Sequence, residues 1–306
     1  MSAEGGTKAV VAALLANLGI AVGKFVAWGA TGSSSMLSEG IHSLADSANQ
    51  VLLLIGGKRA KRAPDVEHQF GYGRTRYLYG FVVAIVLFLV GGLFSVYEGI
   101  HKIQHPEPLT DPQWAFGVLG LAIVLESLSF RTAVREADKI RGQRSLWKFI
   151  RDARQPELPV VLLEDAGALV GLVLALIGVS LSVVTGNGQW DGIGSFSIGV
   201  LLIAIAVVLT TEMASMIVGE SALPADESKI REALESEPLV DRLIHLRTLY
   251  IGPDEILVAA KIAIGGADTG REIAEGIDAA ERAIRLAVPE AVYVFIEPDI
   301  DRGAAG

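Results

Sequence analysis

Long apolar runs dominate the first two-thirds of the chain. Six of them stand out, and they occupy residues 10–30, 36–57, 77–100, 114–133, 158–184 and 193–218. A helix needs roughly 20 mostly apolar residues to cross the hydrocarbon core of a bilayer. Six such runs are hard to bury as core helices of a soluble protein, so the pattern predicts six transmembrane helices.

The pattern changes after Leu223-Pro224, where the proline interrupts the helical periodicity. Helices are predicted over 225–238 and 269–288, and strands over 245–250, 255–264 and 291–296. The sequence therefore predicts an α-helical membrane protein, with six transmembrane helices in residues 1–224 and a small cytoplasmic α+β domain, in the order αββαβ, in residues 225–306. Strands of this kind often pair with those of a second copy, which favours a dimer.

Composition and charge fit this division. Of the 306 residues, 51% are hydrophobic and 20% are charged, and the mean hydropathy is +0.46. Most of the net charge of −9 lies in residues 225–306, where Asp and Glu outnumber Lys and Arg. The lack of cysteine excludes a disulfide scaffold and thiolate metal sites. A nucleic-acid partner is not expected, because no basic face is evident.

The loops between the runs differ in charge. Basic residues gather at 58–76 and 131–154, whereas 31–35 and 185–191 contain none. Cytoplasmic loops carry the excess of Lys and Arg, so both termini are predicted to face the cytoplasm. We expect a multi-pass protein of the cell's inner (plasma) membrane, surrounded by lipid.

Ionisable residues inside the runs are the functional candidates, because charge is costly to bury in a bilayer. They are Lys24, Glu39, His42, Asp46, Glu126, Glu164 and Asp165.

Glu39, His42 and Asp46 are spaced three and four residues apart, which places them on one helix face. Imidazole and carboxylate are ligands for divalent cations such as Zn²⁺. One helix rarely completes such a site, so Asp165 or its neighbour Glu164 is the natural further donor. A hydrogen-bond network between helices is the alternative interpretation of the same residues.

A site of this composition couples metal to protons. Metal ligands must be deprotonated, so metal binding releases protons. Histidine changes its charge near neutral pH. An exchange of protons for a metal ion across the membrane follows from such a site.

These features together resemble the cation diffusion facilitator family, over nearly the whole chain. The motif His42-Ser-Leu-Ala-Asp46, the acidic Leu163-Glu-Asp165, the loop His68-Gln-Phe-Gly-Tyr-Gly-Arg74 and the tail pattern carry the resemblance. Within the family, the branch with a mitochondrial zinc transporter of animals is the most similar. The resemblance implies a homodimeric antiporter that moves Zn²⁺, its transported substrate, out of the cytoplasm with protons as counter-ion.

The resemblance also assigns site residues. His42 and Asp46 match the ligand pair of the second span, and Asp165 matches one of two ligands of the fifth. The other fifth-span position falls on Val161, which cannot bind metal, so Glu164, Glu39 or water would complete the site. A site with fewer nitrogen donors also admits Mn²⁺, Fe²⁺ or Co²⁺.

A second family site lies in the loop after the second span. Asp65 and His68 match its ligands, but Tyr72 stands where another histidine is expected. The alternative is that His68 only caps the loop.

Two other interpretations remain open. The same ligands could hold a catalytic metal in a membrane enzyme, or the tail could serve a membrane sensor. No nucleophile motif and no His-Glu-x-x-His sequence supports an enzyme, so we expect a secondary transporter. Lys24 is expected to pair with Glu126 or Glu39 across the bundle.

Overall fold

The computed structural model describes residues 3–265 and 269–300, with side chains from residue 17 onward except at position 88. The chain forms two compact units. One contains Met1–Gly57 and Tyr77–Ala214, and the other contains Lys58–Arg76 and Ser215–Gly306. The loop after the second helix groups with the C-terminal unit. The predicted division at residue 224 stays a prediction.

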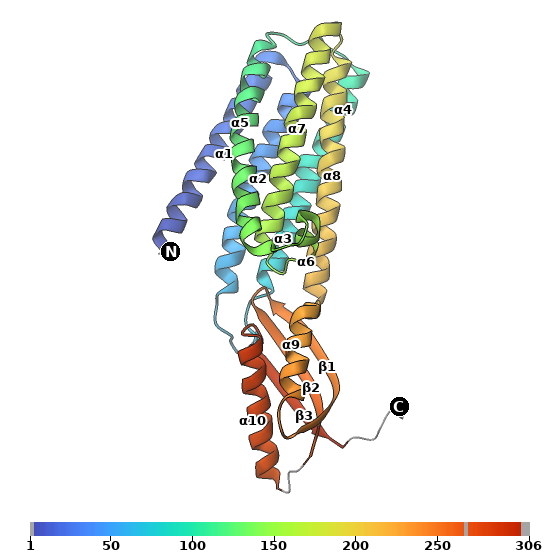
Figure 1. The fold of residues 1–306 in the computed structure, drawn as a ribbon. Coiled ribbons are helices and arrows are strands. Elements are labelled where there is room, and N and C mark those ends of the chain that lie inside the picture. Colours follow the sequence, from blue (N-terminus) through green and yellow to red (C-terminus); the bar gives the residue numbers. More distant parts are fainter. Residues whose placement is uncertain (1–2, 266–268, 301–306) are drawn as a thin grey trace. The chain divides into compact units, whose positions relative to one another are not determined.

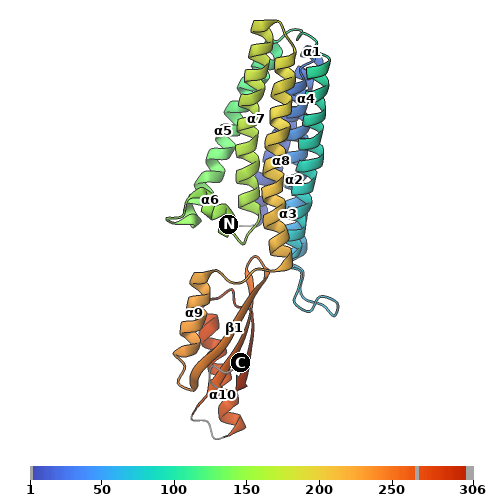
Figure 2. The same ribbon diagram turned by 90° about the vertical axis from the view of Figure 1, so that its right-hand side faces the viewer.

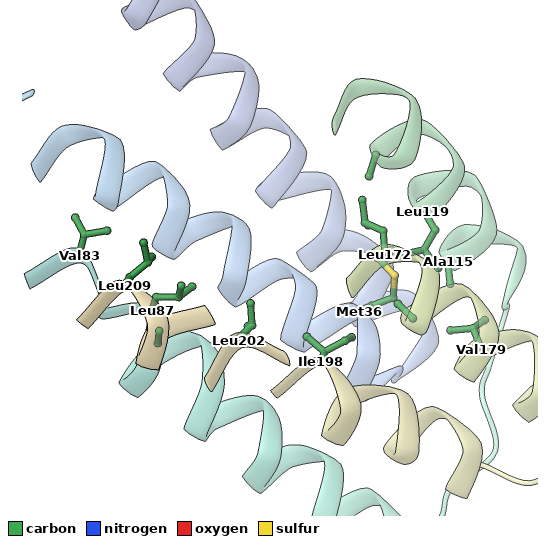
Figure 3. Packing of buried hydrophobic residues seen from close by; sticks show 14 of the residues in the cluster. Met36, Val83, Leu87, Ala115, Leu119, Leu172, Val179, Ile198, Leu202 and Leu209 are labelled. Atoms are coloured by element: carbon green, nitrogen blue, oxygen red, sulfur yellow. The ribbon is translucent and has the colours of Figure 1, made fainter. Parts of the chain in front are cut away.

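The first unit is built from helices, and the long ones run side by side (Figures 1 and 2). They are α1 (Ala3–Thr31), α2 (Ser34–Ala60), α3 (Thr75–Val86), the π-helical turn η1 (Leu87–Leu93), α4 (Phe94–Gln104), α5 (Gln113–Arg141), α6 (Leu146–Asp152), α7 (Glu157–Thr185) and α8 (Gln189–Val218). Met36, Leu172, Ile198 and Leu202 are fully or almost fully buried in the shared core (Figure 3).

Within the described residues, four helical segments are long and apolar enough to cross a membrane, and these are Thr75–Gln104, Gln113–Arg141, Glu157–Thr185 and Gln189–Val218. The first of them joins α3, η1 and α4. The predicted count of six spans is therefore not confirmed. The predicted run 10–30 lies partly outside the described side chains. In α2, many polar residues lower the hydropathy, and most of them are buried inside the unit.

Glycines let α4 and α8 approach closely. A Cβ atom at Gly199 of α8 would lie 2.6 Å from the backbone nitrogen of Val96 in α4. Facing it, a Cβ atom at Gly99 of α4 would overlap the backbone of Phe196. Small residues at such positions bring helices into backbone contact, which is a common packing mode in membranes.

The second unit contains a three-stranded sheet and two helices. Its elements are α9 (Pro224–Glu235), β1 (Val240–Gly252), β2 (Glu255–Ile264), α10 (Gly270–Ala287) and β3 (Tyr293–Asp299). The strand order is β1-β2-β3, with β1 antiparallel and β3 parallel to β2. Ile230 of α9, Val258 and Ile262 of β2, and Ile284 of α10 share one buried core.

The segment Lys58–Arg76 packs on this unit through side-chain contacts. The ring of Phe70 meets that of Tyr293 edge-on, with 5.2 Å between their centroids. Arg76 forms an ion pair of 3.2 Å with Asp254 in the turn between β1 and β2. These contacts explain why the loop belongs with the C-terminal unit.

Candidate metal site

The start of α2 is fixed by a side chain of another helix. Asp191, in the first turn of α8, accepts hydrogen bonds from the Ser34 backbone at 2.6 Å and from the Ser33 hydroxyl at 2.7 Å. The first N–H groups of a helix have no partner within the helix. Asp191 therefore caps α2 and fixes the register in which α2 presents its side chains.

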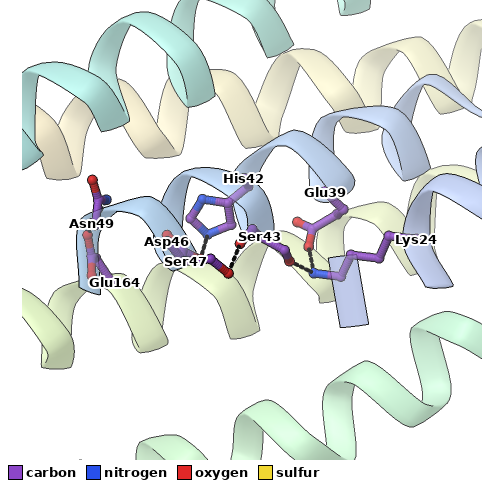
Figure 4. Close-up of polar contacts among 8 residues, drawn as sticks. All are labelled: Lys24, Glu39, His42, Ser43, Asp46, Ser47, Asn49 and Glu164. Atoms are coloured by element: carbon purple, nitrogen blue, oxygen red, sulfur yellow. Dashed lines mark hydrogen bonds and ion pairs between the residues drawn. The ribbon is translucent and has the colours of Figure 1, made fainter. Parts of the chain in front are cut away.

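One face of α2 carries a row of polar side chains, namely Glu39, His42, Asp46 and Asn49. Their intervals of three, four and three residues place them one above the other. Glu39 and Asn49 are completely buried, His42 is 1% exposed, and the side chain of Asp46 is 15% exposed. Figure 4 shows the row, with Lys24 at one end and Glu164 at the other.

His42 and Asp46 form the centre of this row. The Nε2 atom of His42 lies 3.4 Å from the Oδ2 atom of Asp46. Neither ring nitrogen of His42 forms a hydrogen bond in the described structure, and the buried Oδ1 atom of Asp46 has no partner there either. A buried polar atom without a partner costs roughly 1–3 kcal/mol. Buried polar atoms that lack a protein partner are usually satisfied by an ordered water or by an ion, so the pair is a candidate site for either.

The two neighbouring acids of α7 face different helices. Glu164 is buried, and its Oε1 atom accepts a hydrogen bond of 2.7 Å from Asn49 of α2. Asp165 is half-buried and accepts a hydrogen bond of 3.0 Å from Ser129 of α5. Consecutive helical residues point about 100° apart, which explains the difference. Of the two, Glu164 is the acid that contacts the His42 helix.

The surroundings of Asp46 are rich in carboxyl groups. Glu164, Glu126 and Asp165 all lie within electrostatic range of Asp46, as does the ammonium group of Lys24. Lys24 is already paired with Glu39. A cation placed beside Asp46 would therefore be attracted by those of these carboxyl groups that are ionised.

Lys24 binds Glu39 rather than Glu126. Its Nζ atom lies 2.9 Å from Oε2 of Glu39 and 2.7 Å from Oγ of Ser43, and both charged side chains are fully buried. Of the two partners predicted for Lys24, the structure selects Glu39. The other oxygen of Glu39 lies against Gly171 of α7, where an added Cβ would be 2.5 Å away. Glu39 thus has a cationic partner of its own.

The described residues contain no group of three or more His, Asp or Glu side chains arranged to hold a metal ion. The structure thus brings His42 and Asp46 together. It places Glu164 of α7 against Asn49, three residues after Asp46 on α2, and turns Asp165 toward α5. Val161 packs in the apolar cluster between α5, α6 and α7. The assignment of His42, Asp46, Glu39, Glu164 and Asp165 as metal ligands stays a prediction.

The loop candidates Asp65 and His68 are close to each other but engaged in the loop itself. The carboxylate of Asp65 accepts hydrogen bonds from the Tyr72 hydroxyl and from the backbone N–H groups of Glu67 and His68. The Tyr72 hydroxyl, followed by these backbone donors, lowers the pKa of Asp65. The His68 ring packs on Tyr72 with 4.4 Å between centroids. This geometry supports the alternative that His68 caps the loop, and metal binding here stays a prediction.

Sequence reasoning missed Asn49 and Asp191. The missed signal for Asp191 was the run Ser33-Ser34-Ser35, whose residue types favour helix N-caps, together with an acid at the start of a later apolar run. Asn49 gives no signal by itself, because its partner is known only once α2 and α7 are placed together.

The family model for the cation efflux transmembrane domain matches residues 10–218. The chain belongs to the cation efflux family. Among curated relatives, the protein named "Proton-coupled zinc antiporter SLC30A9, mitochondrial" from Xenopus laevis is 32% identical over 91% of this chain and 50% of its own length. "Metal tolerance protein C4" from Arabidopsis thaliana is 29% identical over 85% of this chain and 57% of its own length. The chain thus spans about half the length of these relatives.

Among solved structures, a MamM C-terminal domain is 26% identical over 26% of this chain and 94% of that chain, with a TM-score of 0.24. So low a score does not decide the fold. The family match confirms the resemblance predicted from the motifs, and it supports a membrane transporter rather than an enzyme.

The predicted plasma-membrane location is corrected by the same comparison. Several relatives, among them those from Xenopus laevis and Homo sapiens, are named as mitochondrial proteins. A charge pattern sets the orientation of helices in a membrane but does not identify the membrane, and this explains the error. The expectation of a multi-pass membrane protein is unaffected.

Proposed function

We propose that this chain exports divalent metal cations, Zn²⁺ first among them, in exchange for protons, through the site around His42 and Asp46. The observation that carries the proposal is the set of buried nitrogen and oxygen atoms without hydrogen-bond partners on this pair. Imidazole nitrogen and carboxylate oxygen suit Zn²⁺. The carboxyl groups of Glu164, Glu126 and Asp165 around Asp46 add the attraction for a cation.

Proton exchange follows from the chemistry of these ligands. A metal ion binds only neutral imidazole and ionised carboxylate, so each protonated ligand loses its proton when the metal arrives. When the site opens to a more acidic side, protons replace the metal. The names of the relatives, which describe proton-coupled zinc antiporters, support the coupling of metal transport to protons.

The choice of metal depends on the donor set. One imidazole among carboxylates is a mixed set, and Mn²⁺, Fe²⁺ or Co²⁺ remain alternative cargoes. A metal-dependent membrane enzyme or a sensor is the competing class. Family membership favours a transporter, and only transport predicts a net flux of metal across a sealed bilayer.

The test is metal uptake by sealed vesicles that contain the purified full-length chain, a metal-sensitive dye inside and an imposed pH gradient. We expect wild type to accumulate Zn²⁺ and to dissipate the gradient, and His42→Ala or Asp46→Asn to lose most uptake. His101→Ala is the matched control, since His101 lies exposed on α4. Metal binding without flux in the wild type would instead support the enzyme or sensor.

We further propose that two copies assemble as a homodimer. The second unit exposes large apolar side chains, with Leu286 84%, Phe295 55% and Val292 46% accessible. A second copy would bury such side chains. Light scattering of the full chain in detergent tests the assembly, and a protein mass of one chain at all concentrations would contradict it.

A further inference from the structure

Asn49 carries a polar amide group at a position of α2 that is buried among apolar helices. It is completely buried in α2, and its Nδ2 atom donates a 2.7 Å hydrogen bond to Oε1 of Glu164 in α7. Its other polar atom, Oδ1, is buried and has no hydrogen-bond partner in the described structure. The amide thus uses its donor side on an acid and leaves its acceptor side free.

Asn49 lies next to the candidate metal site. Asn49 follows Asp46 by three residues on the face that also carries His42, and Figure 4 shows these side chains in one row. Glu164 also lies within electrostatic range of Asp46. The pair Asn49–Glu164 therefore adjoins the pair His42–Asp46 in the same buried layer.

We propose that Asn49 is a specificity-determining residue of the cation site. Its amide N–H holds Glu164 toward α2, in place of the donor that Val161 cannot supply, and its carbonyl oxygen, which has no hydrogen-bond partner in the described structure, would bind the cation. This inference rests on the proposed function, because it assumes that a cation binds at His42 and Asp46.

The donor atoms of this arrangement predict how the site discriminates between Mn²⁺ and Zn²⁺. Amide and carboxylate oxygens are hard donors that suit Mn²⁺, whereas imidazole suits Zn²⁺. With Asn49 and Glu164 in the site, three oxygen donors stand beside one nitrogen. Removing Asn49 should therefore weaken Mn²⁺ transport more than Zn²⁺ transport. A bond that only joins α2 to α7 would affect both metals equally.

The experiment measures KM and kcat for Zn²⁺ and for Mn²⁺ in the vesicle assay, with full-length wild type, Asn49→Leu, Glu164→Gln and the double variant. Loss of a residue that orients a metal ligand typically costs 10-fold to 100-fold in affinity. We expect Asn49→Leu to raise KM for Mn²⁺ about tenfold and for Zn²⁺ by a smaller factor. In the double variant, KM should stay within about twofold of the worse single variant, because both act on one contact.

Gln50→Leu is the matched control, because Gln50 carries the same amide group on the neighbouring position of α2 but points to another face. It should leave the ratio of the two KM values at the wild-type figure. If Asn49→Leu does not assemble as a monodisperse protein, Asn49→Ser serves in its place, since serine keeps a small polar side chain, and the same shift in the ratio is expected.

Three results would overturn the inference. One is an unchanged KM for both metals in Asn49→Leu, and another is an equal rise for both. The third is a double variant in which the two single effects multiply. Wild-type vesicles that carry neither metal would instead overturn the proposed function itself, and that outcome is visible before any variant is measured.

Discussion

The buried ion pair between Lys24 of α1 and Glu39 of α2 allows a sharp prediction about stability. Both side chains are fully buried, and Lys24 Nζ lies 2.9 Å from Glu39 Oε2 and 2.7 Å from Ser43 Oγ. The second carboxylate oxygen of Glu39 has no hydrogen-bond partner in the described structure. Lys24→Met therefore leaves a buried acid without its cation.

The expected magnitude follows from this geometry. Removing one partner of a buried pair costs about 3–5 kcal/mol, because the remaining charge is uncompensated. Replacing both partners by apolar residues of similar volume is often neutral. We expect Lys24→Met and Glu39→Met each to lower the free energy of unfolding by about 3 kcal/mol, and the double variant to lower it by about 1 kcal/mol or less.

The assay is reversible unfolding of the full chain in mixed micelles, followed through the fluorescence of its 4 tryptophans. The double-variant cycle gives the coupling free energy between the two residues. A double variant as unstable as the sum of the two single variants would refute the reasoning, because the two side chains would then act independently.

Three further changes have defined expectations. Asp191→Ala removes the acceptor that caps α2 and should lower the free energy of unfolding by roughly 2–3 kcal/mol, and an unchanged unfolding curve would contradict the cap. Thr269→Ala breaks the capping box that Thr269 and Glu272 form at the start of α10; it should cost about 1 kcal/mol, seen as faster hydrogen exchange in the first turns of α10, and unchanged exchange there would argue against it. Burial raises the pKa of Glu255 in the folded chain above its unfolded value, with Asp254 adding to the shift. Its favourable contribution is thus present below the unfolded pKa and lost as pH rises through the folded pKa. Glu255→Gln should therefore unfold at a higher temperature than wild type at neutral pH, with the difference shrinking in acid; equal melting at both pH values would be inconsistent with this.

The sequence predicted the elements that depend on local pattern. The run 158–184 corresponds to α7 (Glu157–Thr185), and the run 193–218 to α8 (Gln189–Val218), because uninterrupted apolar residues have no other stable placement. The strand over 245–250 is longer in the structure, where β1 begins at Val240. Its added residues are stabilised by pairing with β2, which a local pattern does not reveal.

The candidate site was predictable only in part. The spacing of His42 and Asp46 placed them on one face from helical geometry alone. The sequence did not distinguish between Glu126 and Glu39, on different helices, as the partner of Lys24. In the structure Lys24 pairs with Glu39. The different orientations of Glu164 and Asp165, and the contact with Asn49, depend on how α7 is rotated against α2. Such rotation follows from packing of the whole bundle rather than from any short motif.

The central claim is that His42 and Asp46 bind one divalent cation inside the membrane domain. X-ray absorption spectroscopy of the full chain loaded with one equivalent of Zn²⁺ tests it most directly, because it reports the atoms bound to the metal. The chain has 5 histidines. The account predicts an imidazole contribution at about 2.0 Å from the zinc that disappears in His42→Ala and persists in His101→Ala. An oxygen-only spectrum, or an imidazole contribution that survives in His42→Ala, would contradict it.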